Sequence, residues 1–336
     1  MTYERIEWRP LGYEIFVLVN FGLIYLLTAP NTNAVLETLP SVMAQMSVSL
    51  LLQICAGVVI RLIVGAIRGG WREYLAVIRK PAWIVETVRM LIIGALVVHV
   101  YCWIKTALPL LHPRLFDQEL WDFDRAIFFG ISPNIFALNL FSNHTLLRFV
   151  DATYGNIFVA SVFIAFAYFL SAPSRRLRIA FVTTNAAMWI IGAWLYMALP
   201  SLGPAYRFPD VWFQYSADFV RTQQLQALLW KNYAEVIKLR LPGGRPGNVN
   251  IILGIAAFPS MHVAFQTFVF LWFRRLWTWG QVTFALFAFV IFLGSLLTGW
   301  HYLIDSLAGL LLAWAAWTLA SRKFRIARWA HLRRVL

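Results

Sequence analysis

Residues 281–298, QVTFALFAFVIFLGSLLT, and 301–320, HYLIDSLAGLLLAWAAWTLA, are two apolar runs separated by only two residues. Each run is close to the ~20 residues that a helix needs to cross a bilayer. Runs of the same kind recur along the chain, around 13–28, 42–66, 90–111, 152–171, 179–199 and 258–273. The sequence therefore predicts an all-α fold, a polytopic membrane bundle of about eight transmembrane helices.

The composition also indicates a membrane protein. The chain is 60% hydrophobic and 13% charged, whereas a soluble domain is roughly 45–50% apolar and about 25% charged. Its net charge of +14 comes from basic residues scattered between apolar runs, a pattern typical of cytoplasmic loops and not of nucleic-acid binding. Cys55 and Cys102 lie inside apolar runs, so the sequence suggests neither a disulfide framework nor a cysteine metal site.

The basic residues gather in alternate connections, at 5–9, 68–89, 175–178, 274–275 and 322–333. The positive-inside rule makes these connections cytoplasmic, which predicts a multi-pass protein of a bacterial inner membrane with both termini in the cytoplasm. The first run could instead be a signal peptide because small residues follow it near Ala34. Its flank at 4–9 mixes acidic with basic residues, which favours a retained span.

Two long connections, about 112–151 and 200–257, fall on the external side. The first is acidic between Asp117 and Asp124 and then apolar over 127–140, which favours a helix lying in the interface or re-entering the membrane. In the second, apolar residues recur at helical intervals over 216–240. This spacing predicts a surface helix packed over the spans, and it ends where Pro and Gly become frequent, at 242–247.

The first of three external clusters with candidate chemistry is KLRLPGGRP, residues 238–246. Lys238 offers a point charge and Arg245 a planar fork, which together suit the oxygens of a phosphate. Basic residues near a membrane surface also meet lipid headgroups, so this cluster alone decides little.

The second cluster is FPSMH, residues 258–262. Pro259 suits the first turn of a helix, where unpaired N–H groups form an anion site. Ser260 can add a hydroxyl donor and His262 a proton. The alternative is an ordinary helix start with an incidental interface histidine.

The third cluster, TGWHYLID at 298–305, opens the last span. His301 and Asp305 stand at i and i+4 and so share one helix face. An aspartate that accepts from one ring nitrogen leaves the other as a base or nucleophile. The alternative is a structural ion pair between helices.

The order Lys-x6-Arg-Pro, Pro-Ser-x-His and Gly-x-His-Tyr-x-x-Asp-x-x-Ala-Gly, from Lys238 to Gly309, resembles the three signature motifs of the type 2 phosphatidic acid phosphatase superfamily, integral-membrane relatives of vanadium haloperoxidases. The resemblance implies a six-helix catalytic domain over 90–336, preceded at 1–89 by two further spans and a basic loop. The stretch Asp117-x-x-Leu120-x-x-x-Asp124 is similar to the branch that includes inositol phosphorylceramide synthases.

The resemblance also implies roles. His301 would attack phosphorus and form a phosphohistidine, Asp305 would orient its ring, and His262 would protonate the leaving oxygen. Lys238, Arg245 and Ser260 would hold the phosphoryl oxygens. Neither a metal nor another cofactor is implied.

Two of the three motifs depart from the family pattern. The third motif normally begins with Ser-Arg, where this chain has Gly294 and Ser295; Arg207 or Arg240 could supply the missing charge. Met261 stands where the second motif usually has glycine. A further stretch, Lys105-x6-His112-Pro113, repeats the spacing of the first motif far upstream, and chance is the better account of it.

We therefore expect a membrane lipid phosphatase or phosphotransferase, with the site at the external face and a lipid phosphate as substrate. Water as the acceptor gives hydrolysis. A hydroxyl acceptor gives transfer, as in inositol phosphorylceramide synthases. A non-catalytic transporter or scaffold of the same fold is the remaining alternative. The sequence does not determine the oligomeric state.

Overall fold

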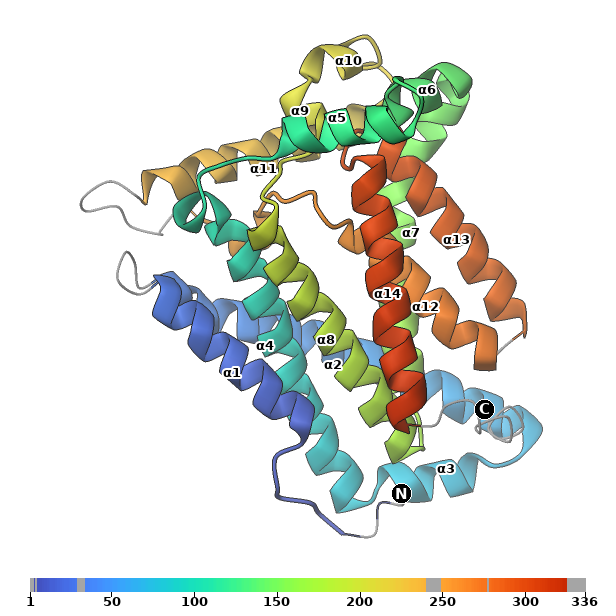
Figure 1. Cartoon of the computed structure of the whole chain (residues 1–336). Helices are drawn as coiled ribbons and strands as arrows, with labels where there is room; N and C mark the ends of the chain where they lie inside the picture. Colours follow the sequence, from blue (N-terminus) through green and yellow to red (C-terminus); the bar gives the residue numbers. More distant parts are fainter. Residues whose placement is uncertain (1–2, 4, 29–33, 240–248, 277, 325–336) are drawn as a thin grey trace.

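The computed structural model describes residues 3, 5–28, 34–239, 249–276 and 278–324. Eight helices of the described residues form the bundle (Figure 1): α1 Gly12–Thr28, α2 Ala34–Arg68, α4 Pro81–Leu111, α7 His144–Leu170, α8 Arg175–Ala198, α12 Met261–Leu276, α13 Thr278–Leu297 and α14 Leu303–Phe324. They correspond one to one with the apolar runs of the sequence. All except α1 and α12 are long and apolar enough to span a membrane by length and composition alone. The predicted polytopic helical bundle is confirmed.

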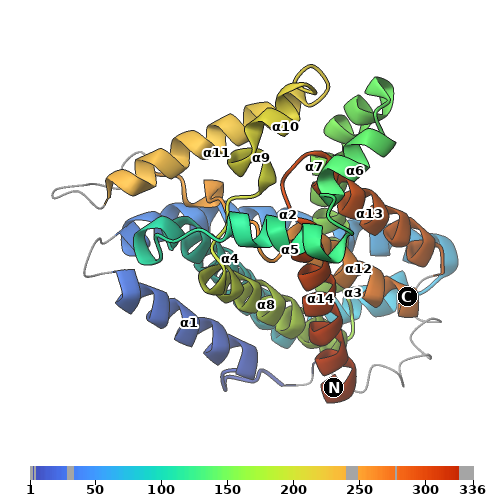
Figure 2. The same ribbon diagram turned by 45° about the horizontal axis from the view of Figure 1, so that its top comes forward.

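Shorter helices cover the two ends of the bundle (Figure 1). One end carries α3 Trp71–Ile78. The other carries what we term the cap: α5 Asp117–Ile127, α6 Pro133–Leu140, α9 Pro204–Arg207, α10 Pro209–Phe213 and α11 Val220–Lys238, with a 3-10 turn, Ile251–Leu253, beneath it. Figure 2 shows α5 and α11 lying across this end. The helix predicted over 216–240 is thus present as α11.

The apolar stretch 127–140 is not one helix. Phe129 adopts a positive φ of 55°, and Ser132 begins α6 as its N-cap, accepting the Ile135 N–H, with Pro133 in the first turn. A capping serine followed by proline is a strong helix start, so the chain turns between α5 and α6. Both helices stay in the cap.

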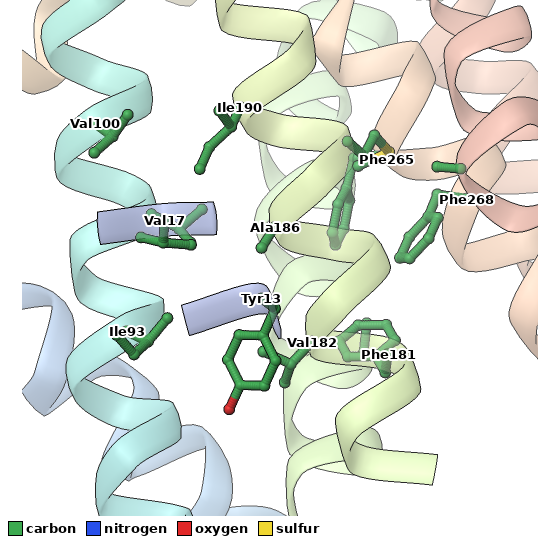
Figure 3. Packing of buried hydrophobic residues seen from close by; sticks show 14 of the residues in the cluster. Tyr13, Val17, Ile93, Val100, Phe181, Val182, Ala186, Ile190, Phe265 and Phe268 are labelled. Carbon is green, nitrogen blue, oxygen red and sulfur yellow. The ribbon is translucent and has the colours of Figure 1, made fainter. Parts of the chain in front are cut away.

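The core lies where α4 and α8 pack against each other and against α1, and where aromatic side chains of α12 contact those of α8 (Figure 3). The side chains there are buried and almost wholly apolar; examples are Val17, Ile93, Val100, Phe181, Ala186, Ile190, Phe265 and Phe268. Large apolar side chains elsewhere on the spans are exposed, among them Leu52, Val59, Val159, Leu286, Leu311 and Leu319. In a bilayer those faces meet lipid, where apolar exposure has no cost.

The basic connections meet at the end opposite the cap. The buried guanidinium of Arg178, at the start of α8, donates to Tyr3 Oη and Thr87 Oγ1. Arg175 pairs with Glu86 on α4, and Arg89 pairs with Glu14 on α1. Ion pairs and hydrogen bonds between helix ends are what a buried arginine needs to be tolerated. They fix the first span, α4 and α8 relative to one another.

The contact between α2 and α7 depends on a glycine. A Cβ on Gly57 would overlap the Ala167 carbonyl and lie 2.6 Å from Ser171 Oγ. One turn further along α2, Arg61 donates to Ser171 Oγ and to the Tyr168 carbonyl. Small residues at helix contacts let backbones approach closely in membrane proteins.

We predict that Gly57→Ala destabilises the protein by about 1–3 kcal/mol, because the added methyl group has no space and the helices must separate. Gly22→Ala is the matched control, since Gly22 lies in α1 with nothing near its Cβ position; it should leave stability unchanged or raise it slightly. The measurement is thermal unfolding of the purified proteins in detergent. Equal melting temperatures for the two variants would contradict the prediction.

Candidate active site

The second and third sequence clusters come together because α14 carries a glycine where the start of α12 crosses it. A Cβ on Gly309 would overlap the Ser260 carbonyl. At this crossing the Ser260 N–H donates to the Asp305 carbonyl at 2.9 Å. The start of α12, with His262, is thereby fixed beside the start of α14, which follows His301 directly.

His301 lies in the junction between α13 and α14 and is buried. Its Nδ1 is 2.9 Å from the Ala257 carbonyl. A carbonyl can only accept, so Nδ1 carries the proton and Nε2 keeps its lone pair. Asp305 was expected to orient the ring, but its Oδ2 is 3.6 Å from Nδ1, longer than a hydrogen bond. The orienting acceptor is the backbone of residue 257.

Asp305 is fully buried beside this ring. Its Oδ2 accepts the Tyr302 N–H at 2.9 Å, and its Oδ1 has no hydrogen-bond partner among the described residues. The carboxyl group of Asp305 therefore lies beside the His301 ring without a hydrogen bond to it.

His262 stands opposite His301. Its Nδ1 is 3.5 Å from His301 Nε2, and its ring packs edge-on against Phe158 and next to Tyr154. These two aromatic rings come from α7. They hold the imidazole in place without hydrogen bonding to its nitrogens, so that Nδ1 is left to face His301 Nε2.

Burial lowers the pKa of His301 to about 3, the Ala257 hydrogen bond opposes that shift, and the charge of Lys105 adds to it. The ring is therefore neutral at physiological pH. A neutral imidazole whose Nε2 keeps its lone pair is the form that can act as a nucleophile or base.

The two histidines open onto a pocket of about 330 Å³, a size in the range of small-molecule sites. Its walls come from α4, α7, α8, α11, residues 252–256 and Trp300. Polar and charged lining residues are Lys105, Asp151, Asn156, Arg221 and Thr222, and Leu225, Leu229 and Leu253 add an apolar side. A ligand with a charged head and an apolar body fits such a lining.

The remaining predicted site residues lie elsewhere. Lys238 is exposed at the end of α11 and pairs with Glu235 at 2.6 Å. Arg207 is exposed in α9, with its guanidinium over Phe208. Ser260 is buried, and its hydroxyl accepts the Val263 N–H and so caps α12. None of the three lines the pocket. Arg240 and Arg245 lie outside the described residues.

The departures from the family pattern have local explanations. A Cβ on Gly294 would lie 2.6 Å from the Tyr154 ring, so the glycine makes room for an aromatic residue of the pocket. Ser295 points away, toward Ser306 on α14 at 3.2 Å. Met261 packs against Gly192 of α8, also away from the pocket.

The acidic residues of α5 hold the backbone beside the two histidines. Asp117 accepts the N–H groups of Leu202 and Gly203 and the hydroxyl of Tyr302. Asp124 accepts the N–H groups of Leu303 and Ile304 at the start of α14. The sequence showed these carboxylates but not their partners, which lie more than 80 residues away.

Lys105, from the stretch that the sequence analysis attributed to chance, lines the pocket together with both histidines. In the sequence, the one signal for Lys105 as a pocket residue is its position about two turns before the end of the α4 span. No three His, Cys, Asp or Glu side chains of the described residues converge as metal ligands would; that the protein works without a metal stays a prediction.

The helices form a membrane bundle, and two histidines face each other in a pocket beneath its cap. These features define a class of membrane proteins whose site is built on histidines. The model of the PAP2 superfamily matches residues 118–319, and the chain belongs to this superfamily. The match begins within α5, the helix of Asp117 and Asp124, and includes both histidines. No curated protein and no solved structure matches the chain. The division at residue 90 stays a prediction.

We predict that Asp124 makes stability depend on pH. Burial raises its pKa from 3.8 to about 6, although the two N–H donors oppose the shift. Because the neutral form is favoured in the fold, its stabilising contribution is complete below pH 3.8 and is lost as the pH rises through 6. Asp124→Asn removes this loss, so its melting temperature should rise relative to wild type between pH 4 and pH 8.

Asp122→Asn is the control, because Asp122 lies exposed on the same helix. Its melting temperature should follow that of wild type at each pH. A constant offset between Asp124→Asn and wild type across the range would refute the assigned shift.

Proposed function

We propose that this protein is an integral membrane phosphatase or phosphotransferase that acts on a phosphorylated lipid through a phosphohistidine on His301. Superfamily membership supports phosphatase-type chemistry. The observation that carries the proposal is the arrangement of His301, with Nδ1 held by a carbonyl and Nε2 3.5 Å from His262 Nδ1 at the wall of the pocket.

In the first step, His301 Nε2 forms a bond to phosphorus and the bond from phosphorus to the lipid oxygen breaks. His262 gives that oxygen a proton, so the lipid leaves as an alcohol. The imidazole becomes positively charged as the P–N bond forms. The nearby Asp305 carboxyl, 3.6 Å from Nδ1, stabilises that charge.

In the second step, an acceptor oxygen attacks phosphorus, its proton returns to His262, and the P–N bond breaks. Water gives inorganic phosphate, and a hydroxyl compound gives a new phosphoester. The pocket volume of about 330 Å³ is roughly ten times the ~30 Å³ share of one water. It therefore leaves room for an acceptor larger than water.

We further propose that the site faces the extracytoplasmic side. The described basic connections lie at the end opposite the cap (Figure 1), and an excess of Lys and Arg is typical of cytoplasmic loops. An accessibility tag inserted near Gln214, in the cap, should react from outside sealed cells.

We predict that His301→Ala abolishes turnover, with a loss of at least about 10³-fold, because the nucleophile is removed. Purified protein in detergent is offered lipid phosphates and phosphodiester lipids, with and without hydroxyl acceptors, and both phosphate and lipid products are followed. A 32P-labelled substrate should leave acid-labile label on wild type and none on His301→Ala. His262→Ala should slow turnover less, because an acid contributes about 10²–10⁴-fold.

His144→Ala is the matched control, because His144 is exposed in the cap-side end of α7 and pairs with Asp218. It should turn over like wild type. Product formation that is equal in wild type and His301→Ala on every substrate would refute the enzymatic proposal and leave a transporter or scaffold.

We also predict that His301 does not titrate between pH 5 and pH 8. Its pKa is lowered to about 3, so the neutral ring persists throughout this range and is lost only as the pH falls toward 3. The chain has six histidines, so the carbon resonances of isotope-labelled rings can be assigned with His301→Asn. A midpoint near 6.5 for the His301 signal would show that the ring is not buried as described.

A further inference from the structure

A phosphoryl site needs positive charge, and the described residues leave few sources for it. A phosphate monoester carries about −1.5 to −2 charges at neutral pH. The predicted clamp residue Lys238 is exposed and paired with Glu235, and Arg207 does not line the pocket. Among the described lining residues the basic side chains are Lys105 and Arg221.

These two differ in position. Arg221 is exposed in the first turn of α11 and its guanidinium donates to the Ala152 carbonyl, at the rim. Lys105 is half-buried on α4 and lines the same pocket as both histidines. Its charge also contributes to the lowered pKa of His301, as expected of an ammonium close to that ring.

The Lys105 ammonium has no ion pair or hydrogen bond within the described part of the chain. Among the described lining residues the one carboxylate is that of Asp151, and it accepts the backbone N–H groups of Arg221 and Thr222 instead. An ammonium left half-buried without an anion is costly. Such a cost is offset when an anionic ligand binds.

The backbone fixes Lys105 relative to His301. A Cβ on Gly254 would lie 2.9 Å from the Thr106 nitrogen and 3.1 Å from the Lys105 carbonyl carbon, and Thr106 Oγ1 donates to the Ile251 carbonyl. The same short segment continues to Ala257, whose carbonyl accepts from His301. The backbone from Ile251 to Ala257 thus fixes the distance between Lys105 and His301, the proposed nucleophile.

We propose that Lys105 is the cation that binds the phosphoryl oxygens while His301 attacks phosphorus. This assignment rests on the proposed function. It places the charge on the α4 wall of the pocket, whereas Ser295, at the position of the family motif's arginine, is not among the described lining residues. Lysine serves here as a point charge that can follow the oxygens as the phosphoryl group moves from lipid to His301.

The test measures binding of inorganic phosphate, the product of hydrolysis, by calorimetry on the full-length protein in detergent. Lys105→Met should weaken phosphate binding about tenfold or more, since a charge-assisted hydrogen bond is lost. Lys105→Arg should restore part of the affinity. Lys231→Met is the control, because Lys231 is exposed on α11 and outside the pocket lining, and it should bind like wild type.

A second measurement uses wild type alone, so it does not depend on the folding of a variant. Saturating phosphate should protect Lys105, and not Lys231, from an amine-reactive acylating reagent, as read by mass spectrometry of the peptides. Unchanged labelling of Lys105, or wild-type phosphate affinity in folded Lys105→Met, would overturn the assignment.

The two proposals fail in different ways. Lys105-dependent phosphate binding in a protein that turns over no lipid phosphate would support the assignment of Lys105 and overturn the enzymatic function. Turnover that depends on His301, together with phosphate binding that is unchanged in Lys105→Met, would support the enzymatic function and overturn the assignment of Lys105. A wild-type protein that neither binds phosphate nor turns over substrate overturns both.

Discussion

Two carboxylates of one cap helix hold the backbone on which the site is built. Asp117 accepts N–H groups from the junction after α8, and Asp124 accepts those that open α14. The first N–H groups of a helix have no partner within it, and burying them unpaired is costly. Because both junctions lie buried at the end of a membrane bundle, α5 must supply these acceptors, and the geometry around His301 depends on it.

The segment from Asn250 to Phe258 is the second support. Asn232 of α11 donates to the carbonyls of Asn250 and Leu253, which joins the cap to this segment. At its far end, the Ala257 N–H donates to Ser201 and its carbonyl accepts from His301. The segment therefore connects the cap, α4 and His301. A movement of α11 would reach His301 through the Asn232 side chain and the backbone of this segment.

The spans and the two histidines could be predicted from the sequence, because apolar runs and short motifs are local patterns. The pairing of His262 with His301 follows once each motif is placed at the start of a span on the same side. The phosphate-binding set was less predictable. Lys238 has the right spacing from Arg245, but spacing along a chain does not say which way a surface helix turns its side chains. Its amphipathic face directs it toward Glu235 and solvent.

The role of Lys105 could not be predicted from the residues next to it in the sequence. It depends on pocket residues that lie about 150 to 200 positions further along the chain. Seen along the sequence, it is a lysine near the end of a span, where snorkelling is the ordinary explanation. Gly294 and Ser295, which depart from the family motif, show why α13 does not supply the positive charge. Tyr154 occupies the space that a side chain at 294 would need, and Ser295 faces Ser306 between two helices. An arginine side chain at 295 would enter that tight contact, so α13 has no place for the charge. A cation for this site has to come from another element, and on α4 Lys105 already lines the pocket.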